Sequence, residues 1–347
     1  MADANNNRTG KSAARGASGT FSLYDIAKRA GVSPITVSRV INKPELVSVE
    51  TRARVLQVID EMGFVLNRLA SSFSRAASRI VGTVAPPIIN FGIAEQVQGM
   101  SDVFSTSDYQ LLVSPGELSG DHEGRQVMNM LGWQPAGMVL QAFSESDSMR
   151  ETLRTRGLPV VEISEIFGKE PIDCVVGISN HEAARRMTHF LAECGYKRIA
   201  FMGAVSHGND RATRRTLGYR AAMAELGRKP VDVIGPLRAS YAADGLREIM
   251  ELQPDTDAIF CASDTFAIAA VQECHRRGLR VPEDLAFAGF GDLDFASIIV
   301  PALTTVSVDR YSMGSLAAQT LLRRMRGEAD VPRVQDVGFT ITRRASA

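Results

Sequence analysis

From Ile80 onward, short apolar runs alternate with amphipathic segments, and this alternation limits the possible folds more than any other feature. Helical patterns lie between nearly all of the runs, for example at 182–194, 217–226 and 265–277. The runs are residues 79–85, 109–114, 137–142, 158–164, 175–179, 197–203, 231–235, 258–263 and 285–291. Strands that alternate with helices predict parallel, doubly wound sheets with both faces covered. Nine or more strands are too many for one sheet of ordinary size, so we expect two sheets in two lobes.

Polar and aromatic residues at the ends of these runs are the first candidates for a binding site. Lobes of this type bind small molecules in the crevice at the carboxyl ends of their strands. The candidates at such positions are Glu162, Ser263, Asp264, Phe290 and the turn 86–91. The polar side chains can hydrogen-bond a ligand, and Phe290 can stack on one. The alternative for each polar residue is a helix cap or an ordinary strand end.

A different pattern occupies Leu23–Asn42, which predicts two short helices joined by a tight turn. Gly31 ends the first helix, because glycine accepts the left-handed backbone of a helix C-terminus. Ser33 caps the second helix, and Pro34 takes its first position, where a missing N–H costs nothing. The apolar residues that we expect to face inward are Leu23, Ile26, Ala27, Ala30, Val37, Val40 and Ile41. The residues that the second helix turns outward are Ile35, Thr36, Ser38 and Arg39. The pair is an ordinary helical hairpin or a helix-turn-helix that places this outer face in the major groove of DNA.

The rest of this N-terminal region favours the DNA-binding interpretation. Ser48 caps a third predicted helix that runs to about Met62, and the three helices together bury too little surface to be stable without a partner or DNA. Between Arg8 and Arg79 there are 12 basic and 5 acidic residues, whereas the rest of the chain has 27 basic and 34 acidic ones. A basic head on an acidic body is typical of nucleic-acid binding at one end of a protein.

The composition argues against several other classes of protein. No run of 18 apolar residues predicts a transmembrane helix, and residues 1–20 lack the apolar core of a secretory signal. We expect those 20 residues, rich in Asn, Ser, Gly and Ala, to form a disordered arm. The scattered cysteines Cys174, Cys194, Cys261 and Cys274 fit reduced thiols in a cytoplasmic protein and predict neither disulfides nor a zinc site. We expect no cofactor and no metal.

Residues 21–342 resemble the LacI family of bacterial transcriptional repressors along their whole length. The headpiece carries the resemblance through "LYDIAKRAGVSPITVSRVINKPELVSVETRARVLQVIDEMGF". The body resembles the family's periplasmic-binding-protein-like sensor domain through "GYKRIAFMG", "GYRAAMAELG", "CASDTFAIAA", "GLRVPEDLAFAGFGD" and "LTTVSVD". The resemblance implies a helix-turn-helix headpiece at 21–66, a hinge helix or linker at 67–78, and a two-lobed domain for ligand binding and dimerisation at 79–342. The segments "MLGWQPAGMVL", "VVGISNHEAARRMT" and "DVGFTIT" are most similar to the gluconate-operon repressors within the family.

The same resemblance implies an interface with double-stranded operator DNA. Pro34, Ile35 and Arg39 match positions that read bases, and Arg39 can chelate guanine while Pro34 and Ile35 offer only apolar contact. Residues at positions that contact or orient the DNA backbone are Leu23, Ser33, Thr36, Ser38, Asn42, Ser48 and Thr51. Asn67, Ala70 and Phe73 match the hinge helix that enters the minor groove. Phe73 replaces the leucine that the family inserts between base pairs, and phenylalanine is a known wedge of this kind. A homodimer would read the two half-sites of a pseudo-palindromic operator.

The resemblance also implies a small-molecule effector that controls operator affinity. Arg215 and Asp292 match positions that bind the effector, since a guanidinium fork suits a carboxylate and an acidic side chain suits sugar hydroxyls. Arg211 and Arg214 are alternative clamps close in sequence. A sugar acid such as gluconate is the expected effector, and its binding would tilt one lobe on the other and weaken the DNA-bound state.

Three alternatives remain open at this point. A Rossmann-like enzyme would share the alternating pattern, but the sequence has no GxGxxG or GxxxxGK[ST] loop, no HExxH pair and no GxSxG elbow. A solute-binding protein would share the body but not the basic head. A member of the same family could instead bind a neutral sugar as its effector. It could also bind a purine-type corepressor, which would strengthen DNA binding and not weaken it. The absence of a heptad-rich tail after 342 favours a dimer over a tetramer.

Overall fold

The computed structural model describes residues 21–64, 78–86, 91–115, 120–141, 147–166, 170–205 and 210–347. Internal contacts divide the chain into two units, Met1–Ala76 and Ala77–Ala347. The predicted arm at 1–20 and the predicted hinge residues Asn67, Ala70 and Phe73 lie outside the described residues.

The first unit is a bundle of three short helices, α1 (Leu23–Ala30), α2 (Pro34–Asn42) and α3 (Val49–Glu61), with a 3₁₀ turn at Pro44–Leu46. Each helix begins at a serine cap, and Gly31 ends α1 with a φ of 66°. The buried core consists of Ile26, Ala27, Ala30, Val37, Val40, Val55 and Val58, with Leu23 and Ile41 packed against it. The predicted helix pair and its inward face are therefore confirmed.

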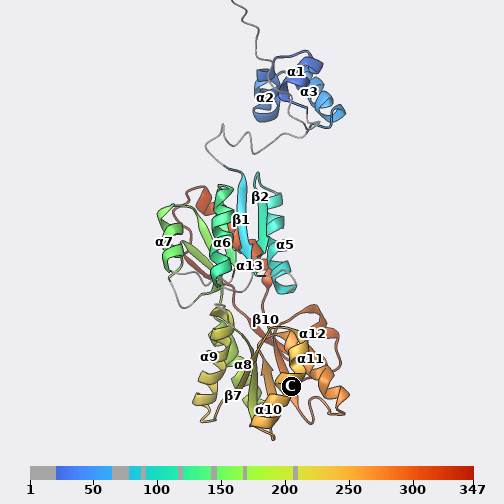
Figure 1. Cartoon of the computed structure of the whole chain (residues 1–347), viewed down its shortest axis with the longest axis vertical. Helices are drawn as coiled ribbons and strands as arrows, with labels where there is room; N and C mark the ends of the chain where they lie inside the picture. Colours follow the sequence, from blue (N-terminus) through green and yellow to red (C-terminus); the bar gives the residue numbers. More distant parts are fainter. Residues whose placement is uncertain are drawn as a thin grey trace, which may run out of the picture. The chain divides into compact units, whose positions relative to one another are not determined.

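The second unit contains two six-stranded sheets, each flanked by helices (Figure 1). The first sheet has the order β11-β5-β4-β3-β1-β2, and all its strands run parallel. Its strands are β1 (Ile80–Ala85), β2 (Gln110–Pro115), β3 (Gly137–Gln141), β4 (Val160–Glu165), β5 (Cys174–Ile178) and β11 (Val334–Asp336). Its helices are α5 (Phe91–Ser105), α6 (Gly120–Gly132), α7 (Asp147–Thr155) and α13 (Arg310–Met325).

The second sheet has the order β12-β10-β9-β8-β6-β7. Its strands are β6 (Ile199–Ala204), β7 (Val231–Gly235), β8 (Ala258–Cys261), β9 (Ala286–Gly291), β10 (Thr304–Ser307) and β12 (Thr340–Thr342). Its helices are α8 (Asn180–Glu193), α9 (Asp210–Glu225), α10 (Ala242–Leu252), α11 (Asp264–Arg276) and α12 (Asp294–Ile298), with a 3₁₀ turn at Ala239–Tyr241. β12 runs antiparallel to β10, while the other strands are parallel.

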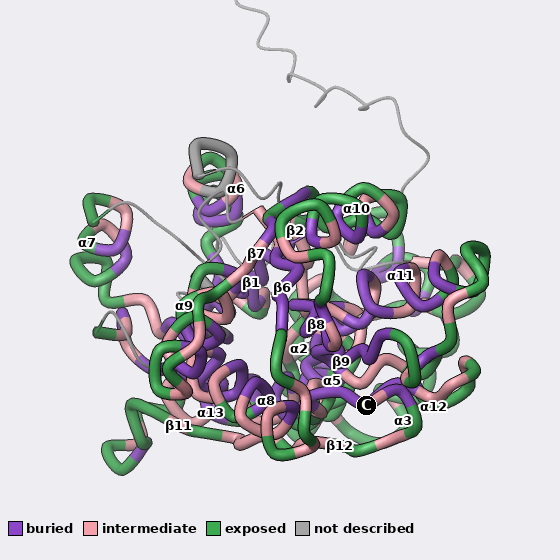
Figure 2. Tube along the Cα trace, turned by 90° about the horizontal axis from the view of Figure 1, so that it is seen from below, coloured by how far each residue is buried: buried purple, intermediate pink, exposed green. Residues whose placement is uncertain are grey.

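Alternation along the strands explains why both faces of each sheet are covered. In β3, Met138 and Leu140 pack with residues of α6 and α7, while Val139 packs on the opposite face with residues of α5 and α13. Successive strand residues point to opposite faces, so an uninterrupted apolar run buries both. Figure 2 shows β8 and β9 of the second sheet in the buried colour, and all of their residues are buried.

The chain crosses between the sheets three times, after β5, after β10 and after β11. The crossing after β5 leads into α8, and the crossing after β10 leads into α13, which packs on β3, β4 and β5 of the first sheet. These crossings place residues 178–180 and 308–310 between the two lobes.

The nine predicted apolar runs each contain a strand, and the predicted arrangement in two sheets is confirmed. The strands β10, β11 and β12 were not among those runs, because their short sequences TTVS, VQD and TIT are largely polar, whereas the equally short β8 is apolar. The second lobe also continues past the predicted limit at 342. Ser346 is fully buried there, and its hydroxyl donates to the Phe287 carbonyl (2.6 Å) and accepts from the Thr304 N–H (2.8 Å).

Candidate functional site

Two adjoining hollows lie where the carboxyl ends of the two sheets meet. The inner chamber is lined by Gln96, Ile163, Ile178, Asn180, Arg211, Arg215, Phe290, Val308, Arg310 and Met313. The outer chamber is lined by Ile93, Ala204, Arg211, Ala212, Arg215, Leu237, Ala262, Ser263, Phe290, Leu293 and Arg310. The chambers share Arg211, Arg215, Phe290 and Arg310, so they form one cleft at two of the three crossings.

Arg215 is the most firmly held side chain of the cleft. It lies one turn into α9, its Nε donates to Asn180 Oδ1 (2.9 Å), and its Nη1 donates to the Ala262 carbonyl (2.7 Å). The guanidinium carbon lies 3.6 Å from the centroid of the Phe290 ring, which is a cation–π contact. These hydrogen-bond partners are neutral, and the carboxylates of Glu165 and Asp264 partly offset the charge of the guanidinium.

Arg310 enters the cleft from the first residue of α13, directly after the second crossing. A Cβ atom at Gly92 would lie 2.5 Å from Arg310 Nε, and one at Gly291 would lie 3.1 Å from Arg310 Nη2. Gly92 belongs to the first lobe and Gly291 to the second. The guanidinium therefore occupies space between the lobes that side chains at these two positions would take.

The electrostatics of the cleft favour an anionic ligand. Burial lowers the pKa of Arg215 well below its ordinary value, and the neighbouring charges of Arg211 and Arg310 lower it further. Burial also lowers the pKa of Arg310. Among the described residues that line the two chambers there is no carboxylate. Three helices, α8, α9 and α13, also point their N-terminal ends at the cleft, where the helix dipole attracts negative charge.

The headpiece presents a separate candidate surface on α2. Ile35 is 66% exposed and Arg39 is exposed, while Thr36 and Ser38 are partly buried. Ser33 Oγ accepts from the Thr36 N–H (3.2 Å) and Ser48 Oγ accepts from the Thr51 N–H (3.4 Å), so both serines cap the helices that follow them. The predicted outward face is thus accessible, with one cation at its centre.

Comparison with known proteins decides the family. Residues 22–67 match the family described as bacterial regulatory proteins, lacI family, and residues 188–347 match a periplasmic binding protein-like domain. The HTH-type transcriptional regulator GntR of Escherichia coli K12 is 35% identical over 323 residues, which cover 92% of this chain and 96% of that protein. The chain belongs to the lacI family.

Two further relatives agree. The HTH-type transcriptional regulator IdnR of Escherichia coli K12 is 31% identical over 325 residues, covering 92% of this chain and 97% of that protein. The crystal structure of a LacI-family transcriptional regulator from Silicibacter pomeroyi has a TM-score of 0.87 at 28% identity, covering 94% of this chain and 99% of that one. The protein is therefore a DNA-binding transcriptional repressor of the lacI family, whose members bind operator DNA and small-molecule effectors and form dimers. These relatives are regulators and not enzymes, which removes the enzyme and solute-binding alternatives.

Several residues predicted to bind the effector lie in the cleft of this repressor. Arg215 and Phe290 line both chambers, and Ser263 lines the outer one, where it also caps α11. Arg211 joins them, whereas Arg214 is not part of either lining.

The predicted acidic residues are engaged by their own lobes. Asp264 is fully buried, with Oδ1 accepting from the Thr305 hydroxyl (2.6 Å) and Oδ2 accepting from the Leu293 N–H (2.7 Å), and burial raises its pKa. Asp292 pairs with Arg344 at 2.7 Å from a left-handed backbone with a φ of 54°. Neither residue lines a chamber, so their predicted ligand roles are left without support from the geometry.

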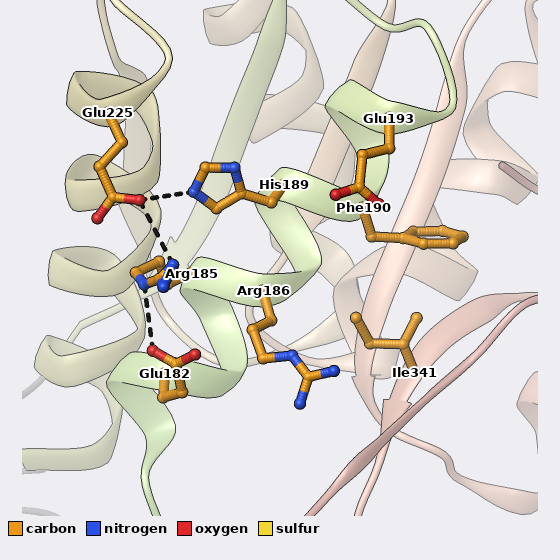
Figure 3. A pocket seen from close by; sticks show the side chains of 8 residues that line it. All are labelled: Glu182, Arg185, Arg186, His189, Phe190, Glu193, Glu225 and Ile341. Atoms are coloured by element: carbon orange, nitrogen blue, oxygen red, sulfur yellow. Dashed lines mark hydrogen bonds and ion pairs between the residues drawn. The ribbon is translucent and has the colours of Figure 1, made fainter.

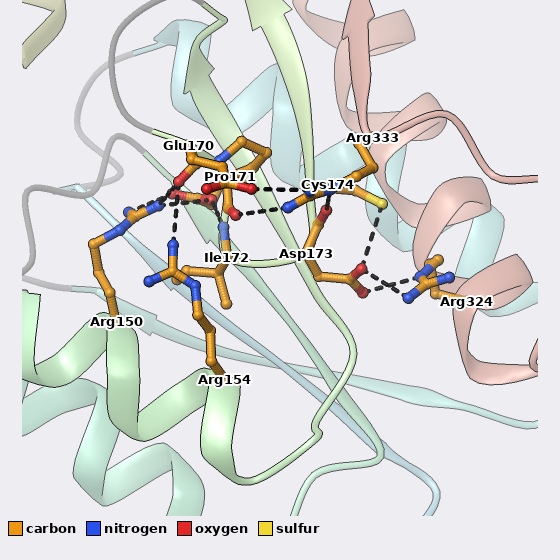
Figure 4. A network of polar contacts seen from close by, with 10 residues as sticks. Arg150, Arg154, Glu170, Pro171, Ile172, Asp173, Cys174, Arg324 and Arg333 are labelled. Carbon is orange, nitrogen blue, oxygen red and sulfur yellow. Dashed lines mark hydrogen bonds and ion pairs between the residues drawn. The ribbon is translucent and has the colours of Figure 1, made fainter.

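Glu162 belongs to a polar network inside the first lobe. It is buried, it pairs with Arg150 at 2.8 Å, and it accepts from the Ile172 N–H at 2.7 Å. Figure 4 shows Arg150 and the neighbouring residues of this network, including Asp173, which pairs with Arg324 of α13 at 2.8 Å. Both partners of Glu162 come from the same lobe, which indicates a structural role.

A third hollow lies on the outer face of α8 and differs from the cleft in its charge. It is lined by Glu182, Arg185, Arg186, His189, Phe190, Glu193, Glu225 and Ile341 (Figure 3). Arg185 bonds Glu182 (3.1 Å) and Glu225 (3.4 Å), and His189 Nε2 lies 2.7 Å from Glu225. Because Arg185 and His189 are paired with Glu182 and Glu225 in its lining, this hollow is a weaker candidate for an anion than the cleft.

Sequence reasoning missed Arg310, Gln96 and Asn180, all of which line the inner chamber. Arg310 and Asn180 directly follow a strand and its short exit, which is the signal that led to Ser263 and Asp264. Gln96 gives no such signal, because it lies inside α5 on a face that looks like ordinary core.

The described ranges contain no group of three His, Cys, Asp or Glu side chains that could hold a metal ion. None of their helices combines the length and the apolar character needed to span a bilayer.

Proposed function

We propose that this repressor binds a sugar acid such as gluconate in the cleft and that binding weakens its hold on the operator. The observation that carries this proposal is the set of Arg215 and Arg310, which line a cleft whose described lining has no carboxylate. Such a set favours an anion over a neutral sugar or a nucleobase, since desolvated cations need a counter-charge. The resemblance to gluconate-operon repressors supports the same class of ligand.

In this proposal Arg215 is the clamp for the carboxylate. Its Nε and Nη1 are already bonded to Asn180 and the Ala262 carbonyl, which leaves Nη2 for the ligand and fixes its direction. A pre-positioned guanidinium loses little side-chain entropy on binding. The ring of Phe290, on which the guanidinium already stacks, forms part of the wall beside it.

The cleft is also placed to change the relation between the lobes. Ile163 and Gln96 come from the first lobe, Phe290 comes from the second, and Arg310 lies at a crossing. A ligand that contacts all of them stabilises one arrangement of the lobes over another, and only such differential binding shifts an equilibrium. We propose that this shift reaches the paired hinges of a homodimer through residues 67–78.

At the DNA end we propose that Arg39 is the hydrogen-bonding base reader of α2. Its side chain is exposed on the face that also carries Ile35, and an arginine can bond guanine O6 and N7 together. Ile35 contributes apolar contact only. The remaining predicted residues of this surface would bind phosphates and fix the register without reading sequence.

The effector proposal is tested by thermal-shift measurements with sugar acids, neutral sugars and nucleobases. A specific binder raises the melting temperature of the native protein. The Arg215→Ala variant should lose about 100-fold in affinity for the sugar acid, because a charge-assisted hydrogen bond is removed. It should bind operator DNA normally without effector, and Arg214→Ala is the matched control. A melting shift from nucleobases alone, with tighter operator binding, would establish a corepressor instead.

The DNA proposal is tested by comparing specific with random DNA. Arg39→Ala should lower affinity for the operator by about 1–3 kcal/mol while changing affinity for random DNA much less. Arg54→Ala, which removes an exposed arginine of α3, serves as the control. Equal losses on both DNAs would show that Arg39 contacts phosphate and not bases.

A further inference from the structure

The inner chamber holds two buried polar atoms that have no hydrogen-bond partner within the described residues. They are Gln96 Oε1, an acceptor, and Arg310 Nε, a donor. Gln96 is only 1% exposed, and its Nε2 donates to the thioether of Met313 (3.3 Å), which is a weak acceptor. Buried polar groups are nearly always paired, so two exceptions in one small cavity require an explanation.

The two atoms complement each other. A hydroxyl group is the smallest organic group that donates to an amide oxygen and accepts from a guanidinium N–H at the same time. Ile163, Ile178 and Val308 add apolar walls to the chamber. The Asn180 oxygen in the same lining already accepts from Arg215 Nε. Ligand hydroxyls in this chamber can therefore donate to Gln96 and accept from Arg310.

The position of Arg310 is fixed from two sides. Ideal Cβ atoms at Gly92 and Gly291 would lie 2.5 Å and 3.1 Å from its guanidinium nitrogens, so glycine at both positions makes room for it. The bulk of any other side chain at either position would displace the Arg310 guanidinium. The donor and the acceptor are therefore held in one cavity by features of three separate segments.

We propose that Gln96 and Arg310 form a hydroxyl-recognising subsite that selects polyhydroxy acids over carboxylic acids without hydroxyls. The inference rests on the proposed function, since it assigns a hydroxyl of that effector to the inner chamber and the carboxylate to Arg215. Gln96 and Arg310 determine specificity, because an analogue without the hydroxyl leaves two buried polar groups unpaired. An ordered water is the simplest other occupant of the same pair.

The test measures affinities of the full-length protein for D-gluconate, hexanoate and sorbitol by calorimetry. The variants are Gln96→Leu and, as the matched control, Gln98→Leu, whose exposed amide bonds Asp102 on the same helix. The wild-type protein should bind gluconate at least about 100-fold more tightly than hexanoate. Gln96→Leu should reduce this ratio at least about tenfold, while Gln98→Leu leaves it unchanged. Operator binding without effector shows that each variant is folded.

Each outcome separates the subsite from the proposed function. If gluconate binds through Arg215 but the ratio is the same in Gln96→Leu, the pair holds only water and the subsite is refuted while the proposed function stands. If sorbitol binds as tightly as gluconate and loses affinity in Gln96→Leu, the subsite stands and the sugar-acid function is refuted. If none of the three compounds binds the wild-type protein, both are refuted.

Discussion

Arg215 and Arg310 are positioned in different ways. Arg215 donates to an amide oxygen and to a carbonyl, and Arg310 lies between Gly92 and Gly291. Carboxylates outside the cleft lining partly offset both charges, Glu165 and Asp264 for Arg215 and Asp264 and Glu95 for Arg310. The hydrogen bonds of Arg215 thus fix its guanidinium in the lining, as a binding site requires.

Gly92→Ala should weaken effector binding by displacing the Arg310 guanidinium. The new methyl group would lie 2.5 Å from Nε, and the flexible arginine gives way more easily than the backbone of α5. We expect a loss of about tenfold in effector affinity with little change in stability, since alanine is also the better helix former. Calorimetry measures the first quantity and urea unfolding the second. Gly124→Ala in α6, where the nearest atom is 3.6 Å away, is the control, and an equal effect of both variants would disprove the reasoning.

The sequence alone predicted the positions of some residues of the candidate site but not their contacts. Ser263 and Asp264 were placed correctly at a strand end, but position does not reveal that Thr305 and the Leu293 N–H use both oxygens of Asp264. Glu162 likewise pairs with Arg150, whose place beside it depends on the packing of α7. Arg215 was predictable because its neighbours in sequence match a known family. Gln96 was not predictable, because its proposed role depends on residues of α13 that are more than 200 positions later in the sequence.

At the scale of elements, α5 and α13 form the contact on which the cleft depends. They cross so closely that a Cβ atom at Gly314 would lie 2.1 Å from the Gln96 carbonyl, and one at Gly99 would lie 2.2 Å from the Tyr311 carbonyl. Both clashes are with backbone, which cannot rotate away. Two glycines therefore set the distance between the helices that carry Gln96 and Arg310.

Gly314→Ala should consequently destabilise the protein and weaken effector binding together. Overpacking of this kind costs about 1–3 kcal/mol, because the helices must separate or bend. Urea unfolding of the second unit measures the stability, and calorimetry measures the effector affinity. Gly132→Ala at the end of α6 has no atom within 4 Å of the new methyl group and should change neither quantity. Unaltered stability in Gly314→Ala would mean that the crossing is looser than described.

Most strands could be predicted from the sequence, but the sheet that each of the last short strands joins could not. Apolar runs identified β1 to β9. Central strands such as β3, β8 and β9 are buried on both faces, whereas the edge strands β2 and β7 are partly exposed. The crossing of the chain from β11 back to β12 was not expected, because strands of three residues leave no periodic pattern. The antiparallel direction of β12 follows from this return and departs from the parallel sheet that was predicted.

For the whole molecule, the three crossings decide how a ligand can act at a distance. Two of them, at residues 178–180 and 308–310, form part of the wall of the inner chamber. A ligand there contacts the segments about which the lobes can move relative to each other. The effector site that we propose is thus part of the connection between the lobes, and a change in its occupancy would change their preferred arrangement.

Linkage between the two ends of the repressor yields the last prediction. If the effector lowers operator affinity by some factor, bound operator must lower effector affinity by the same factor, and typical couplings of 1–3 kcal/mol correspond to about 5- to 150-fold. Operator titrations with and without saturating gluconate measure the change in operator affinity. Gluconate titrations with and without saturating operator measure the change in gluconate affinity, and we expect the two factors to be equal and within this range.

Arg39→Ala should weaken operator binding but keep the coupling factor, because Arg39 lies outside the path between the sites. Arg215→Ala should bind the operator as the wild-type protein does. Gluconate at concentrations that saturate the wild-type protein should not change the operator affinity of this variant. If gluconate leaves the operator affinity of the wild-type protein unchanged, the coupling is refuted. If gluconate raises that affinity, it is a corepressor.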